Sequence, residues 1–105
     1  METIKPTMNL EGLGRNAEKA EATLKLLANS KRLMILCHLI DGKKTVSELS
    51  ECVGLSQSSL SQHLAKMRQN ELLTTDKHGK QVFYHIAKPE VNAILTTLHQ
   101  IYCRE

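Results

Sequence analysis

The sequence predicts a single, mainly α-helical domain that carries one β-hairpin near its C-terminal end. The first observation is length, because 105 residues are the size of one domain. The second is that apolar residues recur every three or four positions up to about residue 70, as on the buried face of a helix. The third is that two short runs rich in Thr, Val, Phe and Tyr follow, as in strands, before the helical spacing returns.

The N-terminal segment predicts little regular structure. Residues 1–15 contain Pro6 and two glycines and show weak periodicity, so we expect a mobile arm that becomes helical near residues 8–13. The folded domain is therefore expected over residues 16–105. The arm lacks the apolar core of a secretory signal, and no apolar run is long enough to span a bilayer. We therefore expect a cytoplasmic protein without a membrane partner.

Four helices are expected before the hairpin, and residues suited to capping helix ends mark their limits. They are expected over residues 16–28 with Asn16 as N-cap, from Ser30 to a stop at Gly42, over residues 46–53, and over residues 56–70 with Ser56 as N-cap. The first of them places Ala17, Ala20, Leu24 and Leu27 on one face.

The hairpin and a last helix complete the chain. Strands are expected over residues 72–76 and 81–86, with a tip at residues 77–80 where Gly79 can take a positive φ. Pro89 suits the first turn of the last helix. Four helices, a hairpin and a fifth helix follow the order of a winged helix-turn-helix domain. Only 3% of the residues are aromatic, and a chain this small has a marginal core, so we expect a dimer.

Residues 46–64 have the pattern of a DNA-binding helix-turn-helix. Leu49, Val53 and Leu60 can hold the two helices together, and Gly54 allows the sharp turn between them. The charge agrees with a nucleic-acid partner without requiring one, because 14 Lys and Arg against 11 Asp and Glu give a net charge of +3.

The exposed side of the second of these helices carries short polar residues instead of the Glu and Lys of an ordinary solvated helix. Gln pairs with adenine through two hydrogen bonds, and Ser can donate or accept at several base edges. Basic residues further along the helix and at the hairpin tip are expected to contact phosphates or the minor groove, and His63 either faces a phosphate or packs beneath the helix. The expected DNA-binding residues are Ser56, Gln57, Ser58, Ser59, Ser61, Gln62, His63, Lys66, Lys77, His78 and Lys80.

Three segments together resemble the ArsR/SmtB family of bacterial winged-helix repressors. They are residues 27–36 (LANSKRLMIL), the helix-turn-helix at 46–64 and residues 81–86 (QVFYHI). The resemblance covers residues 20–103. It implies a homodimer whose first and last helices pack around a two-fold axis, bound to operator DNA as a repressor until an effector releases it.

The resemblance also implies where metal ligands would lie, and the sequence departs from both patterns. Thr45, Ser47 and Ser50 stand where one family site would have cysteines. The other site would have Asp, His, a later His and Glu in the last helix, and Glu90, Asn92 and Cys103 stand in that region. We therefore expect neither standard metal site and no cofactor.

The cysteines resemble those of one branch of the family, the BigR/SqrR/HlyU branch. Cys37 and Cys103 match its pair, which implies a dithiol sensor of persulfides whose bridging by a disulfide or polysulfide lowers DNA affinity. A direct disulfide needs Cα atoms within about 7 Å. We expect the reduced sulfurs to lie too far apart for it, so that inserted sulfur atoms select persulfide donors over peroxide. Cys52 lies outside the pair and is read as structural or incidental.

Other functions stay open. His99 and Cys103 lie four residues apart on one helix face and, with Cys37, could form a new metal or metalloid site. The helix-turn-helix could instead contact only another protein, or act as an anti-silencer that displaces another DNA-binding protein. An enzyme is not expected, because the sequence has no Gly-rich phosphate loop, paired carboxylates or Ser/His/Asp arrangement.

Overall fold

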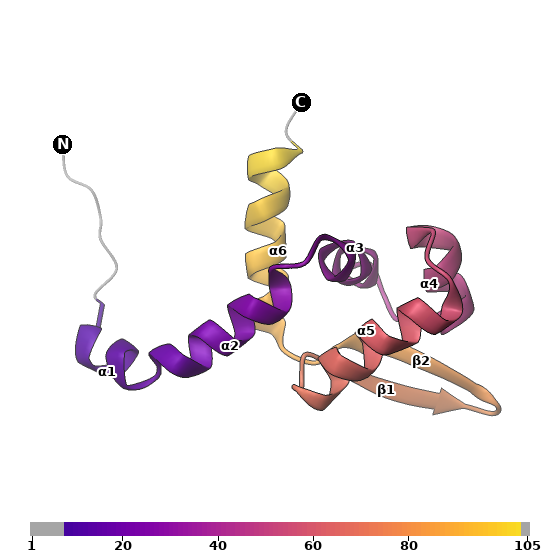
Figure 1. The fold of residues 1–105 in the computed structure, drawn as a ribbon, viewed down its shortest axis with the longest axis horizontal. Helices are drawn as coiled ribbons and strands as arrows, with labels where there is room; N and C mark the ends of the chain where they lie inside the picture. Colours follow the sequence, from indigo (N-terminus) through magenta and orange to yellow (C-terminus); the bar gives the residue numbers. More distant parts are fainter. Residues whose placement is uncertain (1–7, 104–105) are drawn as a thin grey trace.

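The protein is described by a computed structural model that covers residues 8–103 (Figure 1). Its elements are α1 Leu10–Arg15, α2 Ala17–Leu27, α3 Ser30–Leu39, α4 Val46–Val53, α5 Gln57–Gln69, β1 Leu73–His78, β2 Gln81–Ile86 and α6 Pro89–Tyr102. Helices α3, α4 and α5 form a compact head above the hairpin, while α1 and α2 extend to one side and α6 rises away from the hairpin. No helix within residues 8–103 is long and apolar enough to cross a membrane.

The four predicted helices and the last one are all present, and each end lies within three residues of its prediction. An additional short helix, α1, precedes them. The side chain of Asn9 accepts a hydrogen bond from the N–H of Gly12 (2.9 Å) and so caps this helix. It covers residues 10–15, where helix was expected only near 8–13. Residues 1–7 lie outside the described part, so the mobility of the arm stays a prediction.

The helix-turn-helix is fixed by local hydrogen bonds at both of its helix starts. The side chain of Thr45 accepts from the N–H of Glu48, whose carboxylate accepts from the N–H of Thr45, so α4 begins with a capping box. Gly54 has φ 71° and ends α4, at the position where the sharp turn was predicted. Ser56 then caps α5 by accepting from the N–H of Ser59. These contacts confirm the predicted turn.

The hairpin is longer than the sequence predicts. Its register runs from Leu73 opposite Ile86 to His78 opposite Gln81. Only Gly79, at φ 64°, and Lys80 remain in the turn. The predicted four-residue tip is therefore wrong, because a two-residue turn with positive φ matches the strand twist and lets pairing continue to its edge.

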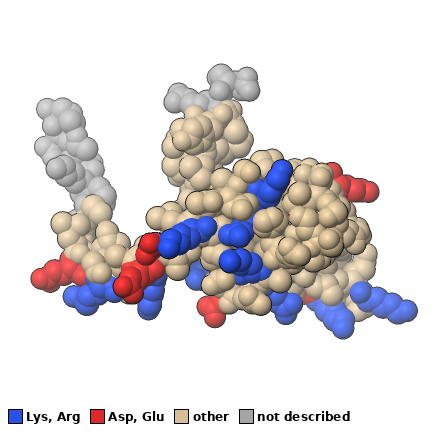
Figure 2. Space-filling view, viewed as in Figure 1, with Lys and Arg blue, Asp and Glu red and all other residues tan. Residues whose placement is uncertain are grey.

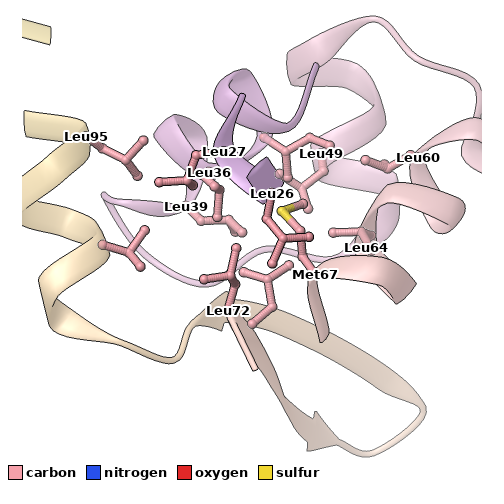
Figure 3. Close-up of a cluster of buried hydrophobic side chains, with 13 residues drawn as sticks. Leu26, Leu27, Leu36, Leu39, Leu49, Leu60, Leu64, Met67, Leu72 and Leu95 are labelled. Atoms are coloured by element: carbon pink, nitrogen blue, oxygen red, sulfur yellow. The ribbon is translucent and has the colours of Figure 1, made fainter. Parts of the chain in front are cut away.

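The core lies where α3, α4, α5, the start of the hairpin and α6 meet. Leu36 and Leu39 of α3 lie between Leu49 and Leu64 on one side and Leu95 of α6 on the other (Figure 3). Burying such side chains stabilises the fold by about 1.5–3 kcal/mol each. α2 contributes only its last turn, Leu26 and Leu27, so most of its apolar face remains uncovered.

Candidate DNA-binding surface and cysteine pair

Helix α5 presents its polar residues because its apolar residues are held in the core. Leu60, Leu64 and Met67 are buried at helical spacing, which turns the opposite side of α5 to solvent. The turn that precedes it is fixed by the hydroxyl of Ser50, which donates to the carbonyl of Leu55 (2.6 Å). The expected DNA-binding residues that lie exposed on or beside α5 are Ser56, Gln57, Ser58, Ser61, Gln62 and Lys66.

Two of the expected DNA-binding residues on α5 are less accessible. Ser59 and His63 are half-buried. The N–H of Ser59 donates to the Ser56 cap, and the ring of His63 accepts from Arg32 of α3 (3.4 Å). His63 therefore faces a neighbouring helix of its own subunit, which is the packing alternative of the sequence analysis.

The wing residues Lys77, His78 and Lys80 are exposed, and one of them is held by a contact that the sequence analysis missed. The Nζ of Lys43, in the loop before α4, lies 2.9 Å from Nε2 of His78 and 3.7 Å from the carboxylate of Asp76. No local sequence pattern predicts this contact, because Lys43 and His78 are 35 residues apart. Lys43 thus ties the wing to the head.

A groove separates α5 from the wing. It has a volume of about 410 Å³ and continues the exposed stripe of α5 through Ser61, Ala65 and Arg68 to Tyr84 of β2. On one face of the molecule, Lys and Arg side chains gather near its middle, between the end of α2 and helices α3 and α5, and again at the hairpin end (Figure 2). Positive charge beside exposed hydrogen-bonding residues suits a nucleic-acid backbone.

Comparisons with known proteins show which family this chain resembles. Residues 29–75 match the family described as bacterial regulatory protein, arsR family. The transcriptional activator HlyU of Vibrio cholerae is 46% identical over 97 residues, which are 92% of this chain and 90% of the relative. The chain belongs to the ArsR family.

Solved structures support the same assignment. Reduced HlyU from Vibrio cholerae has a TM-score of 0.82 at 45% identity, covering 90% of this chain and 99% of that one. The repressor BigR from Xylella fastidiosa has a TM-score of 0.85 at 31% identity, covering 93% and 100%. A homodimeric winged helix-turn-helix domain from Mycobacterium bovis has a TM-score of 0.74 at 20% identity, covering 93% and 89%, and shows the fold alone.

The family assignment confirms the predicted winged helix-turn-helix and the predicted class. HlyU and BigR are regulators of transcription and not enzymes. This ArsR-family chain is accordingly a DNA-binding transcriptional regulator.

The two cysteines singled out in this ArsR-family chain lie on helices that contact each other. Cys37 is half-buried on α3 and packs against the core, while Cys103 is exposed at the C-terminal cap of α6. Burial raises the pKa of the Cys37 thiol, and the negative charge of a Cys103 thiolate raises it further. The helices that carry the two thiols, α3 and α6, contact each other. Cys52, on α4, is exposed.

A cavity opens beside Cys37. It has a volume of about 290 Å³ and is lined by Cys37, Ile40 and Asp41 on one side and by Leu95, Thr96 and His99 of α6 on the other. Within residues 8–103, no three His, Cys, Asp or Glu side chains are grouped so that they could hold a metal ion. The proposed trio of Cys37, His99 and Cys103 is therefore not assembled as a metal site.

Proposed function

We propose that the chain is a homodimeric, operator-binding repressor whose DNA affinity falls when Cys37 and Cys103 are bridged by a disulfide or a polysulfide. The observation that carries this proposal is that Cys37 of α3 and His99 of α6 line the same cavity, and that Cys103 follows His99 by one helical turn, with its N–H donating to the His99 carbonyl (2.8 Å). The resemblance to the BigR/SqrR/HlyU branch supplies the chemical class of the effector, which is a persulfide donor.

Uncovered apolar surface supports the homodimer. Leu24 of α2 and Ile101 of α6 are each 57% exposed, and Tyr102 is 79% exposed. A mainly apolar groove of about 630 Å³ runs along α1 and α2. It is lined by Leu13, Ala17, Ala20, Leu24 and Ala28, together with Glu21 and Lys25. Because exposed apolar surface of this kind marks interaction sites, a second copy of the chain is the expected cover.

The accessibility of the two thiols suggests an order of events. A thiolate is the reactive form of cysteine, and burial raises the pKa of the Cys37 thiol, which lowers its thiolate fraction. The exposed Cys103 thiolate therefore attacks the outer sulfur of a donor R–S–SH, forming Cys103–S–SH and releasing RS⁻. The Cys37 thiolate then attacks the Cys103 sulfur and expels HS⁻, which leaves a disulfide.

Bridges with additional sulfur atoms form by the same kind of attack on the Cys103 sulfur. When Cys37 has also received a sulfur atom, its Cys37–S–S⁻ attacks the Cys103 sulfur and expels HS⁻, which leaves a trisulfide. The donor persulfide is the oxidant in both cases. The cavity beside Cys37 provides space for a donor and for inserted sulfur atoms.

The positions of α3 and α6 suggest how a bridge would reach the DNA. α3 packs against α4, the first helix of the helix-turn-helix, while α6 carries exposed apolar residues of the proposed dimer surface. A bridge between α3 and α6 changes the orientation of helices α3, α4 and α5 relative to the dimer surface. Two recognition helices must reach half-sites about 34 Å apart, so a small change in their separation weakens binding.

Mass spectrometry tests the proposed thiol chemistry. Protein treated with glutathione persulfide is digested without reductant, and a peptide pair joined through Cys37 and Cys103 with zero, one or two extra sulfur atoms is expected. In Cys37→Ser, the added sulfur should remain on Cys103 as a persulfide. Cys52→Ser is the matched control and should form the same joined peptides. An unlinked pair in the wild-type protein would overturn the proposal.

A second mode of regulation is favoured by one observation. The relative that is 46% identical is described as a transcriptional activator, not as a repressor. An anti-silencer that displaces another DNA-binding protein would activate with the same operator contacts. Transcription with purified polymerase and this protein alone separates the modes, because a repressor lowers the transcript and an anti-silencer leaves it unchanged.

A further inference from the structure

Arg32, in the first turn of α3, makes hydrogen bonds to two other helices. Its Nη1–H donates to the carbonyl of Leu26 in the last turn of α2 (3.3 Å). Its Nε–H donates to Nδ1 of His63 on α5 (3.4 Å), across 31 residues of sequence. The backbone N–H of Arg32 donates to the side chain of Asn29, the N-cap of α3 (3.1 Å). This bond holds the backbone of Arg32 in the first turn of the helix. Arg32 therefore stands at the meeting point of α2, α3 and α5.

The bond to Leu26 closes the end of α2. The last four carbonyls of a helix have no partner within the helix, and the Leu26 carbonyl is one of them. Arg32 supplies a charged donor to it, and a cation is also favoured at the C-terminal end of a helix dipole. One guanidinium thus binds the end of α2 and the side of the recognition helix together.

The bond to His63 requires a neutral imidazole. Nδ1 can accept a hydrogen bond only when it carries no proton, so the ring proton lies on Nε2. Burial lowers the pKa of His63, and the positive charges of Arg32 and then Lys31 lower it further. Lys66 lies one turn further along α5 and carries the same sign of charge. The surroundings of His63 therefore favour the state that the bond needs.

We propose that Arg32 and His63 are positioning residues that form a joint between α2 and the recognition helix, and that DNA affinity depends on this joint being closed. α2 belongs to the proposed dimer surface, so the joint sets the angle at which each α5 is held relative to the partner subunit. The inference rests on α5 being the recognition helix and on the dimer, and it is independent of the cysteine chemistry.

Acidification should change DNA affinity in opposite directions, depending on whether His63 forms the joint or contacts a phosphate. A joint opens when His63 is protonated, because a ring with two N–H groups repels the Arg32 donor, so affinity falls as the pH falls through the His63 pKa, below its ordinary 6.5. A phosphate contact would strengthen when His63 is protonated, so affinity would rise over the same range.

The test compares wild-type protein with His63→Asn in DNA binding from about pH 8 to about pH 5. Asparagine can place its amide oxygen near the position of Nδ1 but does not titrate, so this variant should bind like wild type at the upper end and keep its affinity in acid. Wild type should lose about five- to tenfold relative to it. The histidines common to both proteins cancel in this comparison; they are His38, His78, His85 and His99.

A second pair of variants checks the arginine. Arg32→Gln should lower affinity about five- to tenfold at the upper pH with an unchanged salt slope, because no phosphate contact is lost. Lys31→Gln is the matched control, because it removes a neighbouring positive charge but neither hydrogen bond of the joint. It should bind like wild type at the upper pH and lose affinity in acid at a somewhat higher pH than wild type, since the Lys31 charge lowers the His63 pKa. Thermal unfolding of each variant shows whether it is folded. The proposal is overturned if wild type gains affinity in acid relative to His63→Asn, if the two profiles coincide, or if folded Arg32→Gln binds like wild type.

Discussion

Lys44 and Tyr84 exchange two backbone hydrogen bonds, from the N–H of Lys44 to the carbonyl of Tyr84 (3.1 Å) and from the N–H of Tyr84 to the carbonyl of Lys44 (2.8 Å). This isolated bridge joins the loop before α4 to strand β2. The wing is therefore attached directly to the segment that starts the helix-turn-helix, and the side chain of Lys43 adds contacts next to it.

The contacts of Lys43 are exposed. We expect them to help position the wing but to contribute little to the free energy of unfolding. Exposed ion pairs contribute about 0–1 kcal/mol, so Lys43→Ala should change the free energy of unfolding by less than about 1 kcal/mol. Urea denaturation measures this value. A loss of several kcal/mol would mean that the wing is attached mainly through this side chain and not through the backbone bridge.

Gly54 should be sensitive to substitution because it ends α4 at φ 71°. An alanine in this left-handed conformation costs about 1–2 kcal/mol, although no other atom would crowd its Cβ. Gly54→Ala should lower the free energy of unfolding by that amount in a urea titration. Gly14→Ala is a control, because Gly14 lies within α1 with open space around it, and it should cause no comparable loss.

Base contacts and phosphate contacts should separate in salt titrations. Gln62→Ala on α5 is expected to weaken operator binding and leave non-specific binding and the salt slope unchanged. Lys80→Ala at the wing tip is expected to weaken binding to all sequences and to reduce the salt slope by about 1. Equal losses on operator and random DNA for Gln62→Ala would contradict its assignment to base reading.

The dimer surface is tested by placing a charge on it. Leu24→Asp should convert the protein to a monomer in sedimentation equilibrium, because the charge would be buried without a partner. Val82→Asp is the matched control, since Val82 is an exposed apolar residue on the wing (36%) and should leave the oligomeric state unchanged. A monomeric wild-type protein, or an unaffected Leu24→Asp dimer, would contradict the assignment.

Alkylation should follow the difference between the two sensor thiols. Cys103 should react with iodoacetamide before Cys37, because Cys103 is exposed while burial and the neighbouring charge raise the pKa of the Cys37 thiol. Cys103→Ser removes that charge, so the alkylation of Cys37 should reach its half-maximal rate at lower pH. Peptide mass spectrometry at timed quenches follows both reactions. Faster alkylation of Cys37 would contradict the proposed order of attack.

The sequence predicted what depends on neighbouring residues. Capping at Ser56, the turn at Gly54 and the exposed polar side of α5 all follow from spacing within a few positions, whereas the capping box at Thr45 was not predicted. The hairpin tip was wrong by two residues, because the gain from continued strand pairing is not visible in composition. The short α1 helix begins at an Asn9 cap, which was not predicted because the apolar residues around it show only weak periodicity.

The contacts that connect elements were beyond local patterns. Arg32 and His63 are 31 residues apart, and their bond exists only because α3 and α5 cross at that point. The sequence analysis therefore left His63 open between a phosphate contact and packing. The pairing of Cys37 with Cys103 came from a family resemblance. The two cysteines are 103 − 37 = 66 residues apart, and a sequence separation of that length does not indicate whether two residues are close in space.

The central claim is that a bridge between Cys37 and Cys103 weakens DNA binding, and an operator titration by fluorescence anisotropy on Cys52→Ser protein tests it most directly. The same sample is titrated reduced, after glutathione persulfide and after re-reduction, with the bridge verified by mass. The account predicts a loss of affinity of about 5- to 150-fold that re-reduction reverses and that Cys103→Ser does not show. Unchanged affinity in a sample that is fully bridged would contradict it.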